Sequence, residues 1–167
     1  GLITDSGVNT LEPYRVKRAI FLAAGFGSRM VPITLNTPKP LVRVNGKRII
    51  ETLLDAVSAA EIPEIVIVTG YLSEQFEILR NKYPNIKFIY NEKYNEANNI
   101  SSAYLVRGMF SNSYVLESDL YLYNQNLIRN NMIYAAYISI RNSVICLLII
   151  FGLAIYPFQV SNNNIRS

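Results

Sequence analysis

The sequence predicts an α/β fold of Rossmann-like type, in which a mostly parallel sheet is flanked by helices. The chain has 167 residues, of which 50% are hydrophobic, so it is long and apolar enough for one folded domain. Four short apolar runs have the character of strands. They lie at 19–24, 64–70, 86–90 and 113–118. Because helical patterns separate these runs, the connections are predicted to be right-handed crossovers between parallel strands.

A long loop and then a helix are predicted after the first strand. The segment 25–46 contains several glycines and prolines and little periodicity. This indicates a loop, and loops of this length inside a compact domain are usually functional. A helix is expected over 47–60, because apolar residues recur there at helical spacing. These residues are Ile50, Leu53, Leu54 and Val57.

Two further helices are predicted between the later strands. Ser73 is the candidate N-cap of the first, which ends before Pro84. Its apolar face consists of Leu72, Phe76, Leu79 and Tyr83. The second is expected over 98–110, with Ile100, Tyr104 and Leu105 on its inner side. Ligands bind at the carboxyl ends of parallel strands, so the turns after residues 24, 69 and 118 are expected at one edge of the sheet.

The composition excludes several classes of function. Lysine and arginine outnumber aspartate and glutamate by 16 to 12, a formal net charge of +4. This modest excess suits an anionic small molecule, and without a dense basic cluster no nucleic-acid partner is predicted for the domain. The absence of histidine excludes His-based catalysis and His-ligated metals. The single cysteine, Cys146, excludes an internal disulfide and indicates a reducing, cytoplasmic location.

The two ends of the chain differ from the part between them. Residues 1–15 are polar and turn-rich, and we interpret them as a linker or as the end of a preceding module. The chain opens at Gly1 and has no signal-peptide pattern, which is why we interpret it as a piece of a longer protein. Residues 131–167 form an apolar tail whose fold the sequence leaves open.

The tail has three interpretations. Its unbroken apolar stretch, 144–156, is shorter than the roughly 18 residues that cross a bilayer, so membrane contact is an alternative that is not favoured. A buried strand or core helix is the second. The third is a segment that is not the native continuation of the domain, as after a shifted reading frame. The loss of all lysine, aspartate and glutamate after Asp119 slightly favours this third interpretation.

The turn in "FLAAGFGSRM" (21–30) predicts a phosphate-binding loop. Gly25 and Gly27 remove side chains where a backbone must approach a ligand, and their amides can point at oxygens. Arg29 follows at once, and Lys39 lies in "TPKPL" between two prolines that stiffen the loop. The string lacks the third glycine of the dinucleotide fingerprint and the Gly-Lys-Ser/Thr of a Walker loop. It therefore indicates neither a dehydrogenase nor a P-loop ATPase.

Longer strings carry a resemblance to a known family. "LAAGFGSRM…TPKPL" resembles the signature of nucleotidyltransferases that join a nucleoside triphosphate to a phosphorylated small molecule. With "VTGYLSEQF" (68–76) and "NEKYNEANNISSAYLV" (91–106), the chain is similar to bacterial CTP:phosphocholine cytidylyltransferases over about residues 17–128. The string "ANNISSAYL" separates this branch from the sugar-phosphate enzymes. "GLITDSGVNTLEP" resembles the end of a winged-helix module, which leaves a DNA-binding regulator as a competing function.

The resemblance implies a sheet of the nucleotide-diphospho-sugar transferase type, with residues 16–130 as its nucleotide-binding part. It also implies a reaction in which a phosphate oxygen of phosphocholine attacks the α-phosphorus of CTP and pyrophosphate leaves. Arg29 would bind the departing β- and γ-phosphates, and Lys39 the α-phosphate with the incoming phosphate. Asp119 would hold Mg²⁺, a cation that takes carboxylate and phosphate oxygens. The alternatives are a solvated arginine, a surface lysine and a strand-ending aspartate.

A wider set of residues is implied to bind the nucleotide. They are Leu22, Ala23, Ala24, Gly25, Gly27, Ser28, Gly70, Tyr71, Asn98, Asn99, Ser101 and Ser102. Gly70 is equally explained as the end of a strand, and the asparagines and serines as helix caps. Glu117 shares a strand face with Asp119 and is a second carboxylate candidate, for which we favour a structural role.

The chain departs from the family after about residue 129. The family's later half supplies the rest of the sheet, a further acidic metal ligand and most of the choline pocket, and no acidic residue remains here to provide that ligand. We therefore expect an incomplete sheet, impaired turnover and an exposed face that favours association into oligomers. The alternatives are a sugar-1-phosphate nucleotidyltransferase and a non-catalytic nucleotide-binding remnant with a membrane-associated tail.

Overall fold

A five-stranded sheet forms the centre of the molecule. The computed structural model describes residues 9–10, 12–96, 99–130 and 148–149. The strands lie in the order β5-β4-β1-β6-β7. Four are parallel: β1 (Arg18–Ala23), β4 (Glu64–Thr69), β5 (Ile86–Tyr90) and β6 (Ser113–Glu117). The short β7 (Leu148–Ile149) pairs antiparallel with β6. The predicted α/β fold with a mostly parallel sheet is therefore confirmed.

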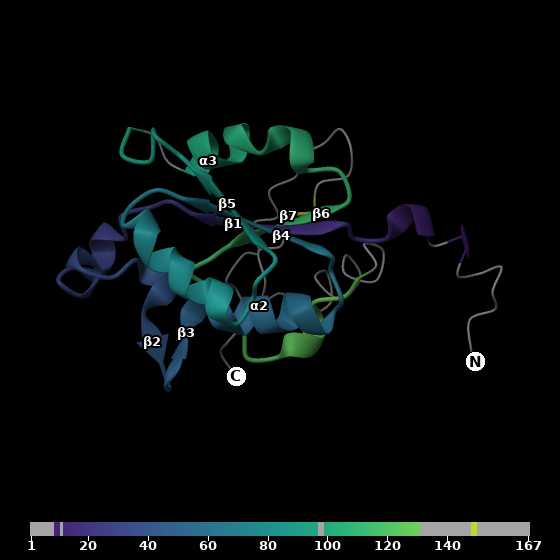
Figure 1. Ribbon diagram of the computed structural model, residues 1–167, viewed down its shortest axis with the longest axis horizontal. Helices are drawn as coiled ribbons and strands as arrows, with labels where there is room; N and C mark the ends of the chain where they lie inside the picture. Colours follow the sequence, from purple (N-terminus) through teal and green to yellow (C-terminus); the bar gives the residue numbers. More distant parts are fainter. Residues whose placement is uncertain (1–8, 11, 97–98, 131–147, 150–167) are drawn as a thin grey trace, which may run out of the picture.

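Helices cover both faces of this sheet (Figure 1). The helix α2 (Ile49–Ala59) and the 3₁₀ helix η5 (Ser73–Asn81) lie on one face, and α3 (Asn99–Leu105) lies on the other. The strand residues alternate accordingly. Phe21 and its register partners Ile67 and Leu116 belong to the hydrophobic cluster on the α2 side. Ile20 and its partners belong to a smaller cluster beside α3.

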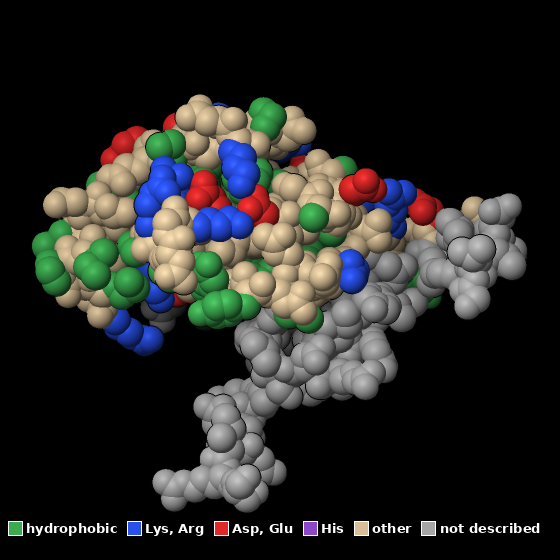
Figure 2. Space-filling model, turned by 90° about the horizontal axis from the view of Figure 1, so that it is seen from below, with side chains coloured by type: hydrophobic (Ala, Val, Ile, Leu, Met, Phe, Trp, Pro, Cys, Tyr) green, Lys and Arg blue, Asp and Glu red, His purple; other side chains and the backbone are tan. Residues whose placement is uncertain are grey.

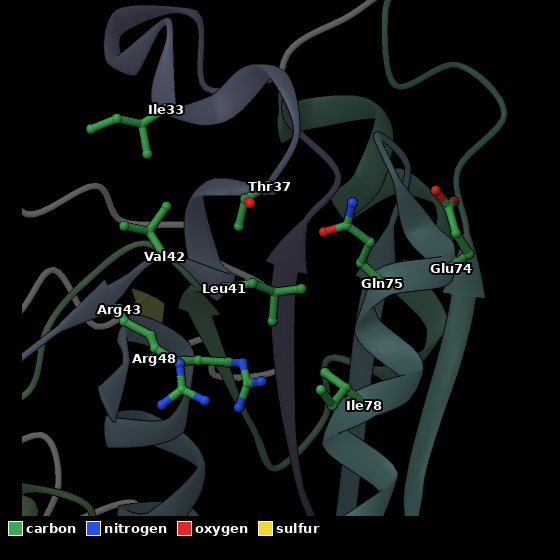
Figure 3. A pocket seen from close by; sticks show the side chains of 9 residues that line it. All are labelled: Ile33, Thr37, Leu41, Val42, Arg43, Arg48, Glu74, Gln75 and Ile78. Carbon is green, nitrogen blue, oxygen red and sulfur yellow. The ribbon is translucent and has the colours of Figure 1, made fainter. Parts of the chain in front are cut away.

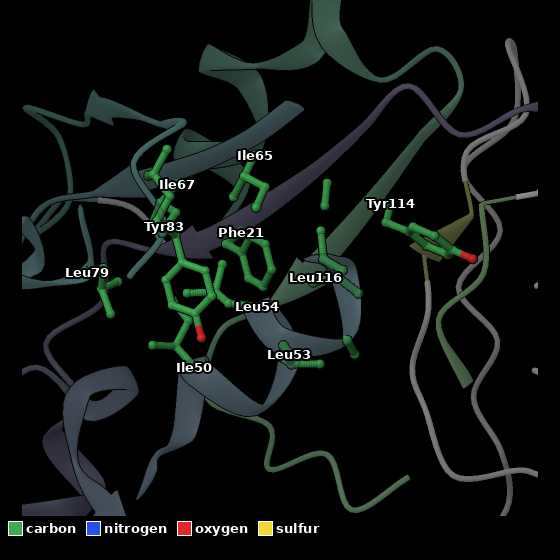
Figure 4. Packing of buried hydrophobic residues seen from close by; sticks show 14 of the residues in the cluster. Phe21, Ile50, Leu53, Leu54, Ile65, Ile67, Leu79, Tyr83, Tyr114 and Leu116 are labelled. Carbon is green, nitrogen blue, oxygen red and sulfur yellow. The ribbon is translucent and has the colours of Figure 1, made fainter. Parts of the chain in front are cut away.

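The larger cluster is the main core of the domain (Figure 4). The helix α2 contributes Ile50, Leu53 and Leu54, each at most 1% exposed. Their spacing places them on one stripe of the helix, which packs against the sheet around Phe21. Burial of such side chains is the dominant favourable term in folding.

Short elements complete the described part of the chain. The loop after β1 contains three single 3₁₀ turns, η2 (Ser28–Met30), η3 (Ile33–Leu35) and η4 (Lys39–Leu41). A hairpin follows, with strands β2 (Arg43–Val44) and β3 (Lys47–Arg48). Asn45 and Gly46 have φ of 52° and 80°, as a two-residue type I′ turn requires. The other 3₁₀ turns are η1 (Glu12–Tyr14), η6 (Arg107–Met109) and η7 (Gln125–Leu127).

Charged side chains are interspersed on the α2 face (Figure 2). Asp55 accepts from Lys47 at 2.5 Å and from Lys82 at 2.7 Å. Burial tends to raise the pKa of Asp55, but the two ammonium groups and the Tyr83 hydroxyl outweigh it, and the pKa is lowered. The network joins β3, α2 and the end of η5, so Lys47 and Lys82 stabilise the packing of these elements.

Two predicted helix starts were wrong. The residues 47–48 belong to the hairpin, so the first helix begins at Ile49. Ser73 is not an N-cap: Leu72 occupies that position in the left-handed region, with φ of 48°, and no side chain caps the helix. Leu72 also shows that the turn before η5 is set by tertiary contacts, because a leucine gains nothing locally from positive φ.

The third predicted helix was wrong in its inner face. It is divided into α3 and η6, and Ile100, Tyr104 and Leu105 are 78%, 63% and 48% exposed. Ser102 and Val106 are the buried residues, at 2% and 0%. Val106 packs in the smaller hydrophobic cluster, and Ser102 can be buried because its hydroxyl accepts from the Asn91 amide. Neither is one of the three residues predicted to face inward.

Most of both ends lies outside the described residues. Of the predicted apolar tail only β7 is described, and the stretch 144–156 is otherwise outside the described part, as are residues 1–8. Within the part of the chain that the structure describes, no helix has the length and hydropathy needed to span a membrane.

Candidate functional site

The carboxyl ends of β1, β4 and β6 meet at one edge of the sheet, as their parallel pairing requires. Along the chain, the next strand of this sheet after the central β1 is β4, which pairs with one side of β1. The later strand β6 pairs with the other side. Such a point, where the strand order reverses, is where ligands bind in open α/β sheets. The glycine turn after β1 and Asp119 after β6 lie on either side of it.

The glycine turn is folded against Lys39. Gly27 has φ of 69°, and a Cβ on it would lie 3.2 Å from the Cβ of Lys39 and 3.2 Å from Cγ2 of Thr34. The Thr34 hydroxyl donates to the Gly27 carbonyl at 2.9 Å. Glycine suits this position, since a side chain would be strained by the positive φ and would be tightly packed against Lys39 and Thr34. The loop thereby places Lys39 beside the turn.

Lys39 and Asp119 form an ion pair across the site. The Lys39 Nζ lies 2.5 Å from Oδ2 of Asp119, and each side chain is about one-third exposed, at 32% and 33%. Ser118 orients the end of β6, because its hydroxyl donates to the Leu22 carbonyl at 2.7 Å. The pair borders a small cavity of about 80 Å³. Its lining residues are Leu22, Ala23, Gly25, Gly27, Lys39, Pro40, Asn99, Glu117, Ser118 and Asp119.

A larger cavity of about 550 Å³ adjoins the small one. The two share Gly25 and Asn99. Arg29 lines the larger cavity with an exposed side chain, so both predicted cations face the region around the glycine turn. A Cβ on Gly25 would meet no atom within 4 Å, which leaves this backbone open to a ligand. The lining residues are Ala24, Gly25, Phe26, Arg29, Tyr94, Asn95, Glu96, Asn99 and Ser102.

The structure divides the predicted nucleotide-binding residues into two groups. Seven line one or both cavities, namely Leu22, Ala23, Ala24, Gly25, Gly27, Asn99 and Ser102. Ser28, Gly70, Tyr71 and Ser101 are not among the lining residues. Asn98 lies outside the described residues.

Gly70 has a packing reason to be glycine. A Cβ there would lie 2.7 Å from Cγ of Tyr94 and 2.9 Å from the carbonyl oxygen of Ala24. The residue therefore admits the Tyr94 side chain to the wall of the larger cavity. Its effect on the site is indirect, and the predicted contact with the nucleotide is not needed to explain the glycine.

Asn91 is a residue that sequence reasoning missed. It is 2% exposed, and its side-chain amide donates to Ser101 at 2.9 Å and to Ser102 at 3.0 Å. Its backbone amide donates to the Thr69 carbonyl, so it links the end of β4 to α3. An asparagine directly after the apolar run 86–90 was the signal that could have identified it.

Glu117 contacts Asn99 rather than Lys39. Nδ2 of Asn99 donates to Oε1 of Glu117 at 3.2 Å, and both residues line the small cavity with Asp119. Among the described residues no three acidic, cysteine or histidine side chains form a metal-binding group. One or two carboxylates suit a hard cation that arrives with substrate phosphates and keeps several waters.

Comparison with known proteins assigns the family. The nucleotidyl transferase family matches residues 18–141. The chain belongs to this family. Its members generally use a divalent metal ion, and the carboxylates of Asp119 and Glu117 both line the small cavity.

Relatives resemble this chain over about half of their own length. The choline-phosphate cytidylyltransferase of Streptococcus pneumoniae is 44% identical over 123 residues, which are 74% of this chain and 53% of the relative. The 2-aminoethylphosphonate cytidylyltransferase of Lancefieldella rimae is 41% identical over 111 residues, or 65% and 45% of the two chains. The solved CTP:phosphocholine cytidylyltransferase from Streptococcus pneumoniae has a TM-score of 0.65 and 47% identity, covering 70% of this chain and 50% of that one.

Proposed function

We propose that the chain carries the nucleotide-binding part of a cytidylyltransferase that transfers CMP from CTP to phosphocholine. The products are CDP-choline and pyrophosphate. The observation that carries the proposal is the convergence of Lys39 and Asp119 beside the open glycine turn, with Arg29 in the adjoining cavity. Both substrates are anions, so bringing them together requires cations held in place before they bind.

Each charged residue has a separate task in the proposed reaction. A phosphate oxygen of phosphocholine forms a bond to the α-phosphorus of CTP, and the bond from that phosphorus to the β-phosphate bridging oxygen breaks. Lys39 neutralises charge on the α-phosphate, since its flexible ammonium follows charge as it moves. Arg29 binds the departing β- and γ-phosphates, for which a planar guanidinium suits a bidentate contact.

Asp119 is the proposed ligand of Mg²⁺, with Glu117 in the same cavity as the second carboxylate. The ion supplies Lewis-acid stabilisation of charge on the phosphates. In the structure, Oδ2 of Asp119 accepts a hydrogen bond from Nζ of Lys39. Binding of the nucleotide then gives Lys39 a phosphate partner and leaves the carboxylate of Asp119 to the cation.

The donor is better supported than the acceptor. The two relatives are both named cytidylyltransferases, but one is named for choline phosphate and the other for 2-aminoethylphosphonate. Both names specify transfer of a cytidylyl group, and they differ in the molecule that accepts it. We propose CTP as the donor and phosphocholine as the first acceptor, with 2-aminoethylphosphonate as the second. The sugar-1-phosphate alternative has less support, because neither of these relatives is named for a sugar.

Calorimetric titration with CTP and Mg²⁺ tests the proposal. We expect saturable binding that Lys39→Ala weakens by about 10- to 150-fold, because a charge-assisted contact is worth about 1.5–3 kcal/mol. Lys17→Ala is the matched control, since Lys17 is exposed near the opposite end of β1. UTP and dTTP should bind more weakly than CTP. A chain that binds none of the three would refute both the proposed function and the nucleotide-binding remnant.

A further inference from the structure

The string "VTGYLSEQF" (68–76) contributes no residue to the two cavities of the proposed site. Two of its side chains reach the phosphate loop instead. The Tyr71 hydroxyl donates to the Leu35 carbonyl at 2.7 Å, and Nε2 of Gln75 donates to the Asn36 carbonyl at 2.9 Å. Tyr71 and Gln75 thus donate hydrogen bonds to two consecutive backbone carbonyls, which lie between Arg29 and Lys39 in the sequence.

The ring of Tyr71 makes a second contact with the same loop. It meets the ring of Phe26 edge-on, with centroids 4.6 Å apart. Phe26 lies between the two glycines of the turn and also lines the larger cavity. Tyr71 therefore touches the loop at two points, one at the glycine turn and one at η3.

Little else lies between this part of the loop and η5. A cavity of about 650 Å³ separates them, and its wall includes Ile33, Thr37 and Leu41 from the loop with Gln75 and Ile78 from η5. Figure 3 shows Gln75 extending from η5 toward Thr37 on the opposite wall. Because the space is not filled by packed side chains, the two hydrogen bonds are an important attachment of the loop on this side.

The loop itself has little regular secondary structure. Its three 3₁₀ helices are single turns of three residues each, and such turns open at low cost. Its middle is nevertheless coupled to the cations. Thr34 is bonded to Gly27, and Gly27 is packed against Lys39. A contact that fixes residues 34–36 thereby fixes the position of Lys39 relative to the glycine turn.

We propose that Tyr71 and Gln75 are positioning residues that clamp the phosphate loop, so that Arg29 and Lys39 are held ready for the triphosphate. The part of this inference that concerns the triphosphate rests on the proposed function. The clamp itself rests on the hydrogen bonds to Leu35 and Asn36, and it exists whatever nucleotide the chain binds.

Hydrogen exchange of the full chain tests the clamp without any ligand. The variants are Tyr71→Phe, which keeps the ring against Phe26 and removes the hydroxyl, and Gln75→Ala. We expect amides of the loop peptide 30–37 to exchange about tenfold faster in both, as local opening becomes easier. Tyr123→Phe and Gln125→Ala are the controls, since both residues are exposed and lie beyond β6. Unchanged exchange in the loop would overturn the clamp.

Titration of the same variants with CTP and CMP, each with Mg²⁺, tests the positioning role. The clamp should affect the β- and γ-phosphates most, so the Kd for CTP should rise about fivefold, as expected for one lost hydrogen bond, and that for CMP less. A merely structural role would weaken both equally or lower the Tm of the domain. Faster exchange with an unchanged ratio of the two Kd values would contradict positioning. Faster exchange in a chain that binds no CTP would leave the clamp standing and refute the proposed function.

Discussion

At the scale of single residues, the site depends on close contacts around glycines. Gly27 and Gly70 are both packed where a side chain has no room, but for different reasons. Gly27 combines a positive φ with contacts to Thr34 and Lys39. At Gly70, a Cβ would collide with the Tyr94 side chain and the Ala24 carbonyl oxygen. A Cβ on Gly25, by contrast, would meet no atom within 4 Å. Two glycines thus shape the wall, and the third leaves backbone accessible.

Gly70→Ala should destabilise the domain by about 1–3 kcal/mol, the usual cost of overpacking. The added Cβ would meet backbone at 2.9 Å and the first ring atom of Tyr94 at 2.7 Å, neither of which is the flexible end of a side chain. Urea unfolding measures the change. Gly108→Ala is the control, because a Cβ there meets nothing within 4 Å. Equal midpoints for the two variants would show that Tyr94 moves aside freely.

Some site residues could be predicted from the sequence because their chemistry is visible locally. A glycine turn after an apolar run, a lysine between prolines and an aspartate at the end of a strand gave Gly25, Lys39 and Asp119, which the structure brings to one edge of the sheet. Tyr71 and Asn91 could not be assigned in this way. The carbonyl that Tyr71 contacts belongs to a residue 36 positions away, and the hydroxyls that Asn91 contacts lie on α3. The asparagine after the apolar run marked the position of Asn91, but no local pattern encodes either set of contacts.

At the scale of elements, periodicity predicted α2 well and α3 badly. The helix α2 buries all four of the apolar residues that were predicted from helical spacing, Ile50, Leu53, Leu54 and Val57. The helix α3 has seven residues and buries Ser102 through hydrogen bonds with Asn91. Ala103 packs against the smaller cluster, whereas the three residues that the same rule selected, Ile100, Tyr104 and Leu105, are exposed. The hairpin was missed although Asn45-Gly46 is a strong turn signal, since its strands have only two residues each.

The strands β1, β4 and β5 are joined by a charge cluster near their amino-terminal ends. Glu64 accepts from Lys87 at 2.8 Å and from Arg18 at 2.7 Å. Hydrogen bonds from Lys87 and then Arg18 lower the pKa of the Glu64 carboxyl below its ordinary value of 4.5. A carboxyl whose pKa is lowered by folding stabilises the native state above its unfolded pKa, and this contribution disappears as the pH falls through the folded pKa.

Glu64→Gln should therefore flatten the acid limb of the stability profile. From pH 7 down to about pH 3, the free energy of unfolding should fall less steeply in the variant than in the parent chain. Urea midpoints at half-unit pH steps measure both slopes. Glu61→Gln, an exposed change just before β4, should retain the parent slope. Parallel curves for Glu64→Gln and the parent would mean that Lys87 and Arg18 do not hold the carboxylate in solution.

At the scale of the whole molecule, the alternation of strands and helices was sufficient to predict the architecture. Four apolar runs became four parallel strands, because crossovers leave few other arrangements. The division into a linker, a nucleotide-binding part and a tail stays a prediction, as does the cytoplasmic location inferred from the cysteine content. No physical rule connects the composition of residues 131–167 to a particular fold.

Exposed apolar side chains on α3 should promote self-association. Ile100 and Leu105 of α3 are 78% and 48% exposed. Replacing both by glutamine should lower the weight-average mass in light scattering at high protein concentration, with Tm within about 1 °C of the parent because little buried surface is lost. Ser111→Gln, an exposed change in a turn, is the control. An unchanged mass would place the associating surface elsewhere.

The central position of β1 has a consequence for how the chain is made. This strand leaves the ribosome before both of its neighbours, and its hydrogen bond from Ser118 to Leu22 joins residues 96 positions apart. At roughly 5–20 residues per second, translation of that interval takes on the order of 5–20 s. During this time β1, whose residues 19–23 are all buried in the folded domain, has at most one of its two flanking strands, and we expect it to be available to a chaperone.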